Sequence, residues 1–554
     1  MAQLVNSILR NAGGDNLQQD SMLSLGLRMF GITLMGGCAA VGVSFLFNRI
    51  AAAISRDLRH AVFSKVESFS SQEFDEFSTA SLITRCTNDV SNIQGIFSVG
   101  VRMIFYAPIM GIGGVFMALQ KAPGMSWIII ISVIVLIGIV SIIISIVLPK
   151  FKIIQSLLDK MNRIARETLN GLMVIRAFGA QDHEKKRFGD VNRDFAKNSL
   201  FVNRVMNIQM PAMQLIQNIS ILVIIWIGAH NIAMHTMEVG DMMAFIQYTI
   251  QIIFAFQFIS MIFIMLPRAA VSGERIAEVL EKKELIKDPE ITDETAAFIM
   301  ESDSKGSKVE FENVSFRYKG AEREALLNIN FTAESGETTA IIGATGSGKS
   351  TIINLILRFY DVSQGRVLLN NIDIRNLSQN ELRSCIGYVP QKSILLSGPI
   401  SFNLKYGNIN STLDEVKEGA EIAQALDFIE GFSEGMDHHL AQGAANVSGG
   451  QKQRLSIARA LIKNPSLLLF DDSFSALDFA TDARLRQTLE EKKKDCTKII
   501  VAQRVGTIMH ADKIIVLAKG GVVGIGKHDE LIQNCQEYRE IAESQINFEE
   551  DSHV

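Results

Sequence analysis

The sequence lacks the features that mark several large classes of protein. Its 554 residues include only five cysteines, and no two of them have C-x-x-C spacing. Scattered cysteines suit a reducing compartment and provide neither a disulfide framework nor a metal site. The formal net charge is only -5, so the composition gives no reason to expect a nucleic acid as a partner. Redox chemistry, disulfide scaffolding and nucleic-acid binding are therefore not predicted.

Charge is also absent from five stretches in the first half of the chain. Each of them is close to or above the roughly 20 residues that a helix needs to cross a bilayer. They are residues 29–47, 103–120, 125–149, 205–229 and 242–267. The connections 48–102 and 150–204 are rich in lysine and arginine, whereas 121–124 and 230–241 have one lysine between them. The positive-inside rule therefore puts both long connections and the C-terminal half in the cytoplasm, and predicts a multi-pass protein of the cell membrane.

Five spans with a cytoplasmic C-terminus would leave Met1 outside, with no signal peptide or earlier span to carry it there. Residues 1–9 resemble the end of a helix that begins earlier. We therefore expect that a first span is missing from the chain, through a trimmed start or a misplaced start codon. The alternative is a genuine five-span protein.

The two basic connections have a helical pattern. Residues 49–74 and 150–166 alternate apolar and charged side chains near the helical period and contain no proline, so the spans are expected to continue as long helices into the cytoplasm. Short uncharged breaks are expected at 79–83 and 168–172. A charged stretch follows the last span and ends in a polar linker.

The second half of the chain contains a phosphate-binding loop. The pattern G-x-x-x-x-G-K-[ST] lies between a β-rich run, 338–342, and a helix-like run, 351–359, which is the context that the motif requires. Its glycines let backbone N–H groups face an anion, the lysine is expected to reach the β and γ phosphates, and the final serine is expected to ligate Mg²⁺. The predicted nucleotide-binding residues are Gly343, Ala344, Thr345, Gly346, Ser347, Gly348, Lys349, Ser350 and Thr351.

Two further segments have residue types that suit phosphate chemistry. The apolar run 467–471 ends in Asp471 and predicts a buried parallel strand that presents a carboxylate to Mg²⁺. Upstream of it, Ser448, Gly449, Gly450 and Gln451 precede a strong helix former, 452–461. Ser448 is a natural helix cap, and the glycines expose a helix N-terminus to an anion.

The order of these segments is specific. A phosphate loop, a Ser-Gly-Gly-Gln signature, a magnesium strand and then Ser475-Ala476-Leu477-Asp478 resemble the ATP-binding cassette (ABC) superfamily. A membrane half ahead of the cassette resembles exporters in which both parts share a chain. The resemblance implies a membrane α-helical bundle (1–285), a linker (286–307), an α/β P-loop nucleotide-binding domain (308–545) and an acidic tail (546–554).

The resemblance also implies roles for other residues. Tyr318 would stack on the adenine ring, and Gln391 would approach Mg²⁺ and sense the γ-phosphate. The breaks at 79–83 and 168–172 match coupling helices that press on the cassettes. Two cassettes would close head to tail on two ATP molecules, each held by the phosphate loop of one and the signature of the other, so that a single chain is half of the transporter.

The cassette departs from the active pattern at two positions. Asp472 follows Asp471 where active cassettes have a glutamate that acts as the base, and Gln503 stands where they have a histidine that contacts the γ-phosphate. The signature is intact except for Val447, where leucine is more frequent. We therefore expect tight binding of Mg-ATP and slow hydrolysis at this site, with the signature and Asp478 serving the site of another subunit. This pattern resembles the degenerate half of bacterial heterodimeric multidrug exporters.

The function predicted from the sequence is half of an ATP-driven exporter of lipophilic compounds or drugs, with a second half-subunit as partner. A slow homodimeric exporter of lipid or peptide and an ATP-sensing subunit without transport are the alternatives. Methionines and phenylalanines in the spans suit an adaptable apolar cavity, although such residues more often face lipid or pack between helices. They are Met206, Met210, Met213, Met242, Met243, Met261, Met265, Phe254, Phe256, Phe258 and Phe263.

Overall fold

The computed structural model describes residues 5–6, 19–121, 123–289 and 306–551, and the chain divides into two compact units. The first unit comprises residues 1–67 and 79–282, and the second comprises residues 68–78 and 283–554. Most of the predicted first-helix end, the greater part of the linker and the side chains of the acidic tail lie outside the described residues. The side chain of Phe263 lies outside them as well.

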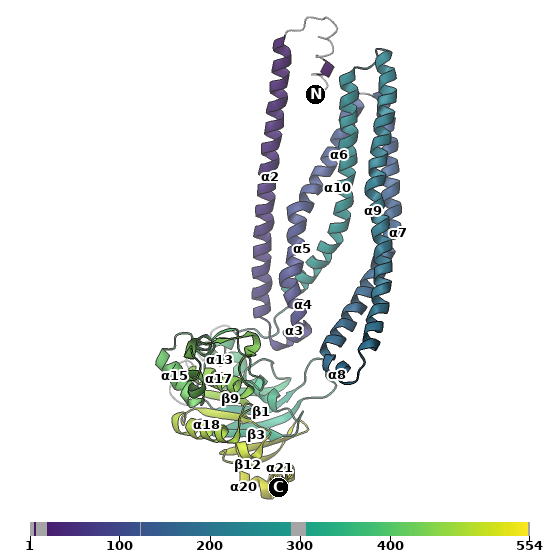
Figure 1. The fold of residues 1–554 in the computed structure, drawn as a ribbon. Helices are drawn as coiled ribbons and strands as arrows, with labels where there is room; N and C mark the ends of the chain where they lie inside the picture. The colour runs from purple at the N-terminus through teal and green to yellow at the C-terminus, as the bar shows by residue number, and fades with distance from the viewer. Residues whose placement is uncertain (1–4, 7–18, 122, 290–305, 552–554) are drawn as a thin grey trace. The chain divides into compact units, whose positions relative to one another are not determined.

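Long helices make up the first unit (Figure 1). Two π-helical turns, Arg85–Asp89 (η1) and Ile96–Gly100 (η2), interrupt the stretch that leads into α6, and Pro123–Met125 forms a 3₁₀ turn. The α-helices are α2 (Gln19–Glu67), α4 (Thr79–Thr84), α5 (Val90–Gly95), α6 (Val101–Lys121), α7 (Ser126–Asn170), α8 (Leu172–Ala177), α9 (Gln181–Ala233) and α10 (Val239–Leu280).

Five helical segments of the described residues are long and apolar enough to cross a membrane, which confirms a multi-pass membrane fold. Helix α7 runs beside α9, and α6 runs beside α10 (Figure 1). Their apolar contacts include a cluster around Phe245, Ile252 and Ile224. The most apolar window of α2, by contrast, has none of its residues buried within the structure.

The predicted helical continuations are confirmed for 150–166, because α7 runs unbroken to Asn170, and for most of 49–74, because α2 ends at Glu67. The predicted break at 79–83 is wrong, since these residues form α4. The helical path is interrupted instead at 68–78, between α2 and α4, and this segment contains the short helix α3 (Ser71–Glu76). Ser70 and Glu73 form a capping box that starts α3, and the extended backbone of Phe77 ends it. The second break falls at Gly171, within the predicted range.

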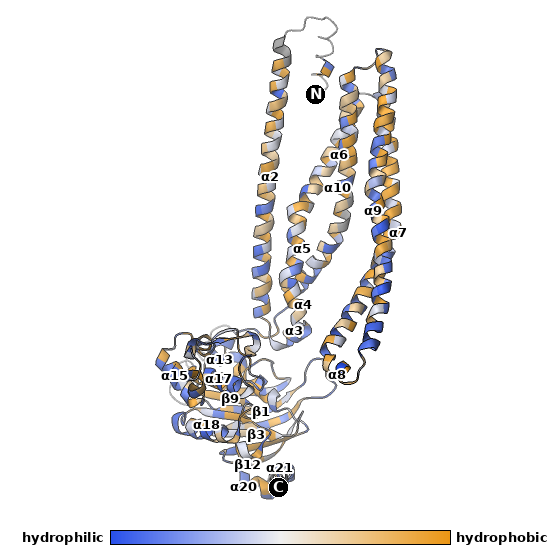
Figure 2. Cartoon of the chain, in the orientation of Figure 1, coloured by the Kyte–Doolittle hydropathy of each residue, from blue (hydrophilic) through white to orange (hydrophobic). Residues whose placement is uncertain are grey.

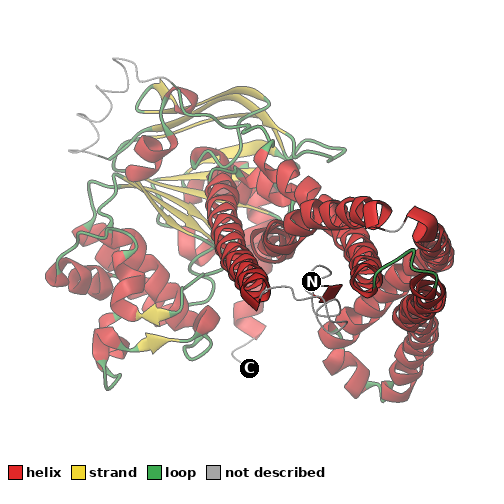
Figure 3. Cartoon of the chain, turned by 90° about the horizontal axis from the view of Figure 1, so that it is seen from above, coloured by secondary structure: helices red, strands yellow, loops and turns green. Residues whose placement is uncertain are grey.

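The second unit has all of the strands of the described residues (Figure 3). A six-stranded sheet has the order β12-β11-β3-β10-β9-β6, and a four-stranded antiparallel sheet has the order β2-β1-β4-β5. The strands are β1 (Val309–Phe316), β2 (Leu326–Ala333), β3 (Thr338–Gly343), β4 (Gln364–Leu369), β5 (Ile372–Asp373), β6 (Ile386–Val389), β7 (Gly398–Pro399), β8 (His439–Leu440), β9 (Leu467–Asp471), β10 (Thr497–Val501), β11 (Lys513–Ala518) and β12 (Gly521–Gly526).

Helices cover this unit and connect its strands. Those that position the site are α12 (Lys349–Ile356) after β3, α17 (Gly449–Ile462) before β9 and α18 (Phe479–Lys492) after it. The others are α13 (Gln379–Ser384), α14 (Ile400–Lys405), α15 (Leu413–Ile422), α16 (Leu426–Glu430), α19 (Val505–Ile508), α20 (His528–Asn534) and α21 (Gln536–Asp551).

Strand β9 lies inside the six-stranded sheet, parallel to both of its neighbours, β10 and β6. All five of its residues are buried. Leu468 and Phe470 pack into the core on one side, and Leu467 and Leu469 pack into the core on the other. This burial on both faces explains why the run is continuously apolar. Because β3, β9 and β10 are parallel, their carboxyl ends meet at one edge of the sheet, where the site lies.

Candidate functional site

The phosphate loop joins β3 to α12 through glycines with left-handed backbone. Gly346 has φ +81 and Gly348 has φ +100. A Cβ atom added at Gly348 would lie 2.5 Å from Cδ2 of Leu326 and 2.8 Å from the carbonyl oxygen of Ala325. A side chain at this position would therefore be strained and would also collide with its neighbours. The loop has this shape because glycine occupies that position.

Lys349 is folded back onto the loop that precedes it. Its Nζ donates hydrogen bonds to the carbonyl oxygens of Gly343, at 2.7 Å, and Ala344, at 2.9 Å. Burial lowers the pKa of Lys349, and the nearby Asp472 and Asp471 carboxylates oppose that shift. The ammonium group is thus held at the loop by carbonyl oxygens.

Ser350 and Asp471 meet across the end of the sheet. The Ser350 hydroxyl donates a 2.8 Å hydrogen bond to Oδ1 of Asp471. Burial raises the pKa of Asp471, while the hydrogen bond from Ser350 opposes the shift. The sequence predicts that both side chains bind Mg²⁺, and in the structure they are in direct contact.

These residues fit Mg²⁺ and a nucleotide phosphate. The hydroxyl of Ser350 and the carboxylate of Asp471 are the oxygen donors that Mg²⁺ prefers. The hydroxyl of Ser347 is buried and has no hydrogen-bond partner among the described residues, so a donor is available inside the loop. When bound, Mg²⁺ would neutralise charge on the phosphate oxygens.

Asp472 accepts hydrogen bonds from two side-chain amides. Nε2 of Gln391 lies 3.2 Å from Oδ2 of Asp472, and Nε2 of Gln503 lies 2.9 Å from the same oxygen. Asp472 is 8% exposed, and its φ of 47 places it in the left-handed region, which aspartate tolerates better than most residues. The three residues that the sequence singled out are therefore joined in one small cluster.

Tyr318 lies in the loop after β1, outside the strand itself. Its hydroxyl and that of Thr351 are 3.1 Å apart, so one of them donates to the other. The Tyr318 ring meets the rings of Phe316 and Tyr360 edge to face, with centroids 4.8 Å and 5.2 Å apart. Tyr318 is thus held beside the start of α12, next to the phosphate loop.

The signature forms the N-terminus of α17. The backbone N–H of Gln451 donates to the Ser448 hydroxyl at 3.2 Å, and the Ser448 N–H donates to Oε1 of Gln451 at 2.8 Å. Ser448 and Gly449 are exposed. Within the part of the chain that the structure describes, no hydrogen bond joins the signature to the phosphate loop. Asp478 caps α18 in a similar way, through the backbone N–H and the hydroxyl of Thr481.

Sequence reasoning missed a set of contacts between the cassette and α3. The Tyr360 hydroxyl donates to Asp75 at 2.9 Å, and Lys319 forms an ion pair with Glu76. Glu73, fully buried, accepts from the backbone N–H of Leu285 at 2.6 Å. The Ser-x-x-Glu capping box at Ser70 was the available signal for a helix at this position.

Comparison with known proteins agrees with this geometry. The family model "ABC transporter transmembrane region" matches residues 1–256, and the model "ABC transporter" matches residues 326–475. An uncharacterised ABC transporter ATP-binding protein of Mycobacterium tuberculosis is 38% identical over 544 residues, which cover 98% of this chain and 92% of the relative. The chain is an ABC transporter.

Two other relatives of this ABC transporter have more specific names. An ATP-dependent lipid A-core flippase of Syntrophus aciditrophicus is 31% identical over 93% of the chain and 84% of the relative. A putative multidrug export ATP-binding/permease protein of Bacillus subtilis is 30% identical over 89% of the chain and 83% of the relative. A bacterial Atm1-family ABC exporter with ATP bound has the same fold, with a TM-score of 0.77 at 24% identity, over 98% of this chain and 94% of that one.

Proposed function

We propose that this ABC transporter is one half of an ATP-driven exporter of lipophilic compounds. In this proposal the chain holds Mg-ATP at a hydrolysis-impaired site of its own and donates Ser448, Gly449, Gly450 and Gln451 to the active site of a different subunit. The arrangement around Asp472, where two amides donate to one carboxylate oxygen, is the observation that supports it most directly.

Asp472 is poorly suited to act as the base for ATP hydrolysis. Relative to glutamate it lacks one methylene, which withdraws the carboxylate by roughly 1.5 Å. A general base has to lie within roughly 2.6–3.2 Å of the proton that it takes, and misplacement on the order of 1 Å can cost about 100-fold in rate. The amides of Gln391 and Gln503 also occupy one of its oxygens. Asp472 is thus held at the site but is too short to orient an attacking water.

Gln503 adds a second deficit. An amide donates and accepts hydrogen bonds, but it has neither the positive charge nor the titratable proton of a protonated histidine. In the structure the side-chain amide of Gln503 donates a hydrogen bond to Asp472. We expect a weaker contact with the γ-phosphate than histidine would make.

The residues proposed to bind the nucleotide are unaffected by either change. The glycine loop, Lys349, Ser350 and Asp471 have the geometry described above, and Tyr318 lies beside Thr351. The signature helix is preorganised, because its capping box fixes Ser448 while the exposed hydroxyl keeps its proton free to donate to a phosphate. The chain therefore has what is needed to bind one ATP and to help with another.

The lipophilic cargo is supported by the spans and by two relatives. No Asp, Glu, Lys or Arg lies inside the five apolar stretches, which argues against a dedicated path for inorganic ions. The relatives named above are a lipid A-core flippase and a putative multidrug export protein. The first of these names specifies a lipid, and the second specifies drugs.

The test is the ATPase rate of the chain alone and with a candidate partner, a half-transporter that has a glutamate after its magnesium aspartate and a switch histidine. We expect slow hydrolysis by the chain alone, a partial increase with Asp472→Glu and a larger increase with Asp472→Glu/Gln503→His. In the complex, removal of the partner's glutamate should abolish most of the activity. Rapid hydrolysis by the isolated chain that Lys349→Ala abolishes would instead identify a homodimeric transporter, and the asymmetric proposal would be wrong.

A further inference from the structure

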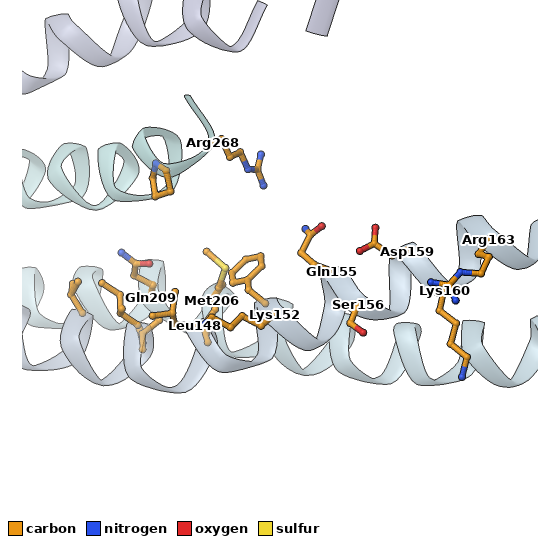
Figure 4. Close-up of a pocket in the computed structure, with 16 residues that line it drawn as sticks. Leu148, Lys152, Gln155, Ser156, Asp159, Lys160, Arg163, Met206, Gln209 and Arg268 are labelled. Carbon is orange, nitrogen blue, oxygen red and sulfur yellow. The ribbon is translucent and has the colours of Figure 1, made fainter. Parts of the chain in front are cut away.

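A cavity of about 1060 Å³ lies between α7, α9 and α10 of the first unit (Figure 4). Of the methionines and phenylalanines expected to form an adaptable cavity, Met206 lines this one. The complete lining is Val140, Ile143, Ile144, Val147, Leu148, Phe151, Lys152, Gln155, Ser156, Asp159, Lys160, Arg163, Met206, Gln209, Pro267 and Arg268.

One continuous face of α7 forms most of this wall. Its lining residues recur every three or four positions from Val140 to Arg163, which is the period of a single helix face. The face changes character abruptly: up to Phe151 every lining residue is apolar, and from Lys152 onward every one is polar or charged. Figure 2 shows the same change along α7 from hydrophobic to hydrophilic.

The length of the apolar half matches half of a membrane. Residues 140–151 rise by roughly 16 Å at about 1.5 Å per residue. The hydrocarbon core of a bilayer is about 30 Å thick, so one leaflet contributes about 15 Å. The apolar wall therefore has about the depth of one acyl-chain layer, and the polar wall follows directly after it.

The polar half is predominantly cationic. It has four cations, Lys152, Lys160, Arg163 and Arg268, and a single carboxylate, Asp159. None of the four cations forms an ion pair or a hydrogen bond with the residues that the structure describes, and all four are exposed. Figure 4 shows Gln155 and Asp159 projecting from α7 and Arg268 projecting from α10. Lys152 and Arg268 come from different helices and both line the region next to the apolar wall.

We propose that this cavity binds an anionic amphiphile, with its acyl chain against residues 140–151 and its acidic headgroup between Lys152 and Arg268. The proposal rests on the proposed function, because it treats the bound amphiphile as the cargo of the exporter. A cationic lipophile would place its charge among uncompensated cations, and a small inorganic anion would leave the apolar wall without a partner. An amphiphile with an acidic end satisfies both halves.

The role of the cationic residues of the cavity is tested with three ligands that have the same hydrocarbon tail and differ only in the charge of the headgroup. The full chain is placed in nanodiscs of neutral phosphatidylcholine without nucleotide, and three probes are compared by fluorescence anisotropy: an anthroyloxy-labelled stearic acid, its methyl ester and the corresponding amine. We expect the acid to bind at least about tenfold more tightly than the ester or the amine. Lys152→Gln/Arg268→Gln should remove this preference, and Lys152→Glu/Arg268→Glu should reverse it in favour of the amine.

The matched control is Lys186→Gln/Lys197→Gln, which removes two exposed lysines of α9 that do not line the cavity and should leave the preference unchanged. Nucleotide binding by each variant shows that it is folded. Equal binding of the acid and the ester, or equal losses in the control and the cavity variants, would overturn the proposal. These results do not depend on ATP hydrolysis, so failure of the asymmetric ATPase model would leave them interpretable.

A second arm identifies the source of the amphiphile. Nanodiscs that contain phosphatidylglycerol are compared with neutral ones. If the labelled acid is displaced by phosphatidylglycerol and not by added neutral lipid, the cavity takes its ligand from membrane phospholipids. If the acid binds equally well in both, the ligand is a free amphiphile, and the assignment of acidic headgroup and acyl tail stands in either case.

Discussion

The hydroxyl of Tyr360 donates a 2.9 Å hydrogen bond to the carboxylate of Asp75. Asp75 belongs to α3, which lies in the sequence between the long helix α2 and helix α4. The ring of Tyr360 meets the ring of Tyr318 edge to face, and Tyr318 contacts Thr351 at the start of α12. A short series of contacts thus leads from the proposed adenine platform to α3, the segment that lies between α2 and α4 in the sequence.

Tyr360→Phe tests this connection, because it removes one donor and leaves the ring in place. We expect a loss of about 1 kcal/mol of stability, nearly unchanged nucleotide binding and a several-fold fall in transport per ATP hydrolysed. The matched control is Tyr538→Phe, which removes a hydroxyl that contacts His528 at 2.7 Å in the C-terminal helices. An equal effect of both variants on transport would contradict a specific role for the Tyr360 contact.

The phosphate loop offers a comparison between two glycines. Gly348→Ala introduces a Cβ into the space of Leu326 and the Ala325 carbonyl, whereas a Cβ at Gly346 meets nothing within 4 Å. Both changes impose a left-handed backbone on alanine, which costs roughly 1–2 kcal/mol. We expect only Gly348→Ala to abolish binding of a fluorescent ATP analogue and to unfold the start of α12. Similar affinities for the two variants would show that the close packing at Gly348 is unimportant.

The pH dependence of the nucleotide-free cassette follows from Asp472. Burial raises the pKa of this carboxyl above its ordinary value of 3.8, so the folded state binds more protons than the unfolded state just above pH 3.8. As the pH rises through the raised pKa, Asp472 loses its proton in the folded state and the folded state becomes less stable. The cost of burying the charged carboxylate is fully present at neutral pH.

Asp472→Asn should remove this penalty. At pH 7 we expect a higher midpoint of thermal unfolding than for the unaltered chain, and the increase should shrink towards pH 4. Asp495→Asn is the control, since Asp495 is exposed. A midpoint that falls in Asp472→Asn at pH 7 would show that the amides of Gln391 and Gln503 stabilise the carboxylate more than burial destabilises it.

The first unit contains a buried carboxylate that depends on one hydroxyl. Asp89 is 4% exposed and accepts a 2.7 Å hydrogen bond from Ser272 of α10, while its other oxygen has no partner among the described residues. Ser272→Ala should therefore destabilise the unit by about 1.5–3 kcal/mol, the range for a hydrogen bond to a charged group. Ser91→Ala, which removes an exposed hydroxyl bonded to its own helix, should change the unfolding midpoint little.

Much of the cassette could be predicted from sequence because its chemistry depends on local patterns. The loop at Gly343 needs glycine and lysine at fixed positions, and β9 is apolar throughout because both of its faces are buried. Ser350 and Asp471 could be assigned to one site in advance because their motifs predict that both bind Mg²⁺. The break was predicted where the sequence lacks charged residues, at 79–83. Helix α3 lies elsewhere, because the capping box that starts it includes the charged residue Glu73. The contacts of Tyr360 and the position of Arg268 beside the face of α7 depend on tertiary packing, which no local pattern encodes.

The apolar window of α2 has no buried residue in the structure. The free energy of unfolding of this helix therefore depends on the medium that surrounds it. In hydrocarbon its exposed side chains cost nothing, and in water they would favour association or unfolding. A melting temperature measured on this chain therefore describes the chain together with its detergent, lipid or companion protein. Comparisons between variants are meaningful only when that surrounding medium is held constant.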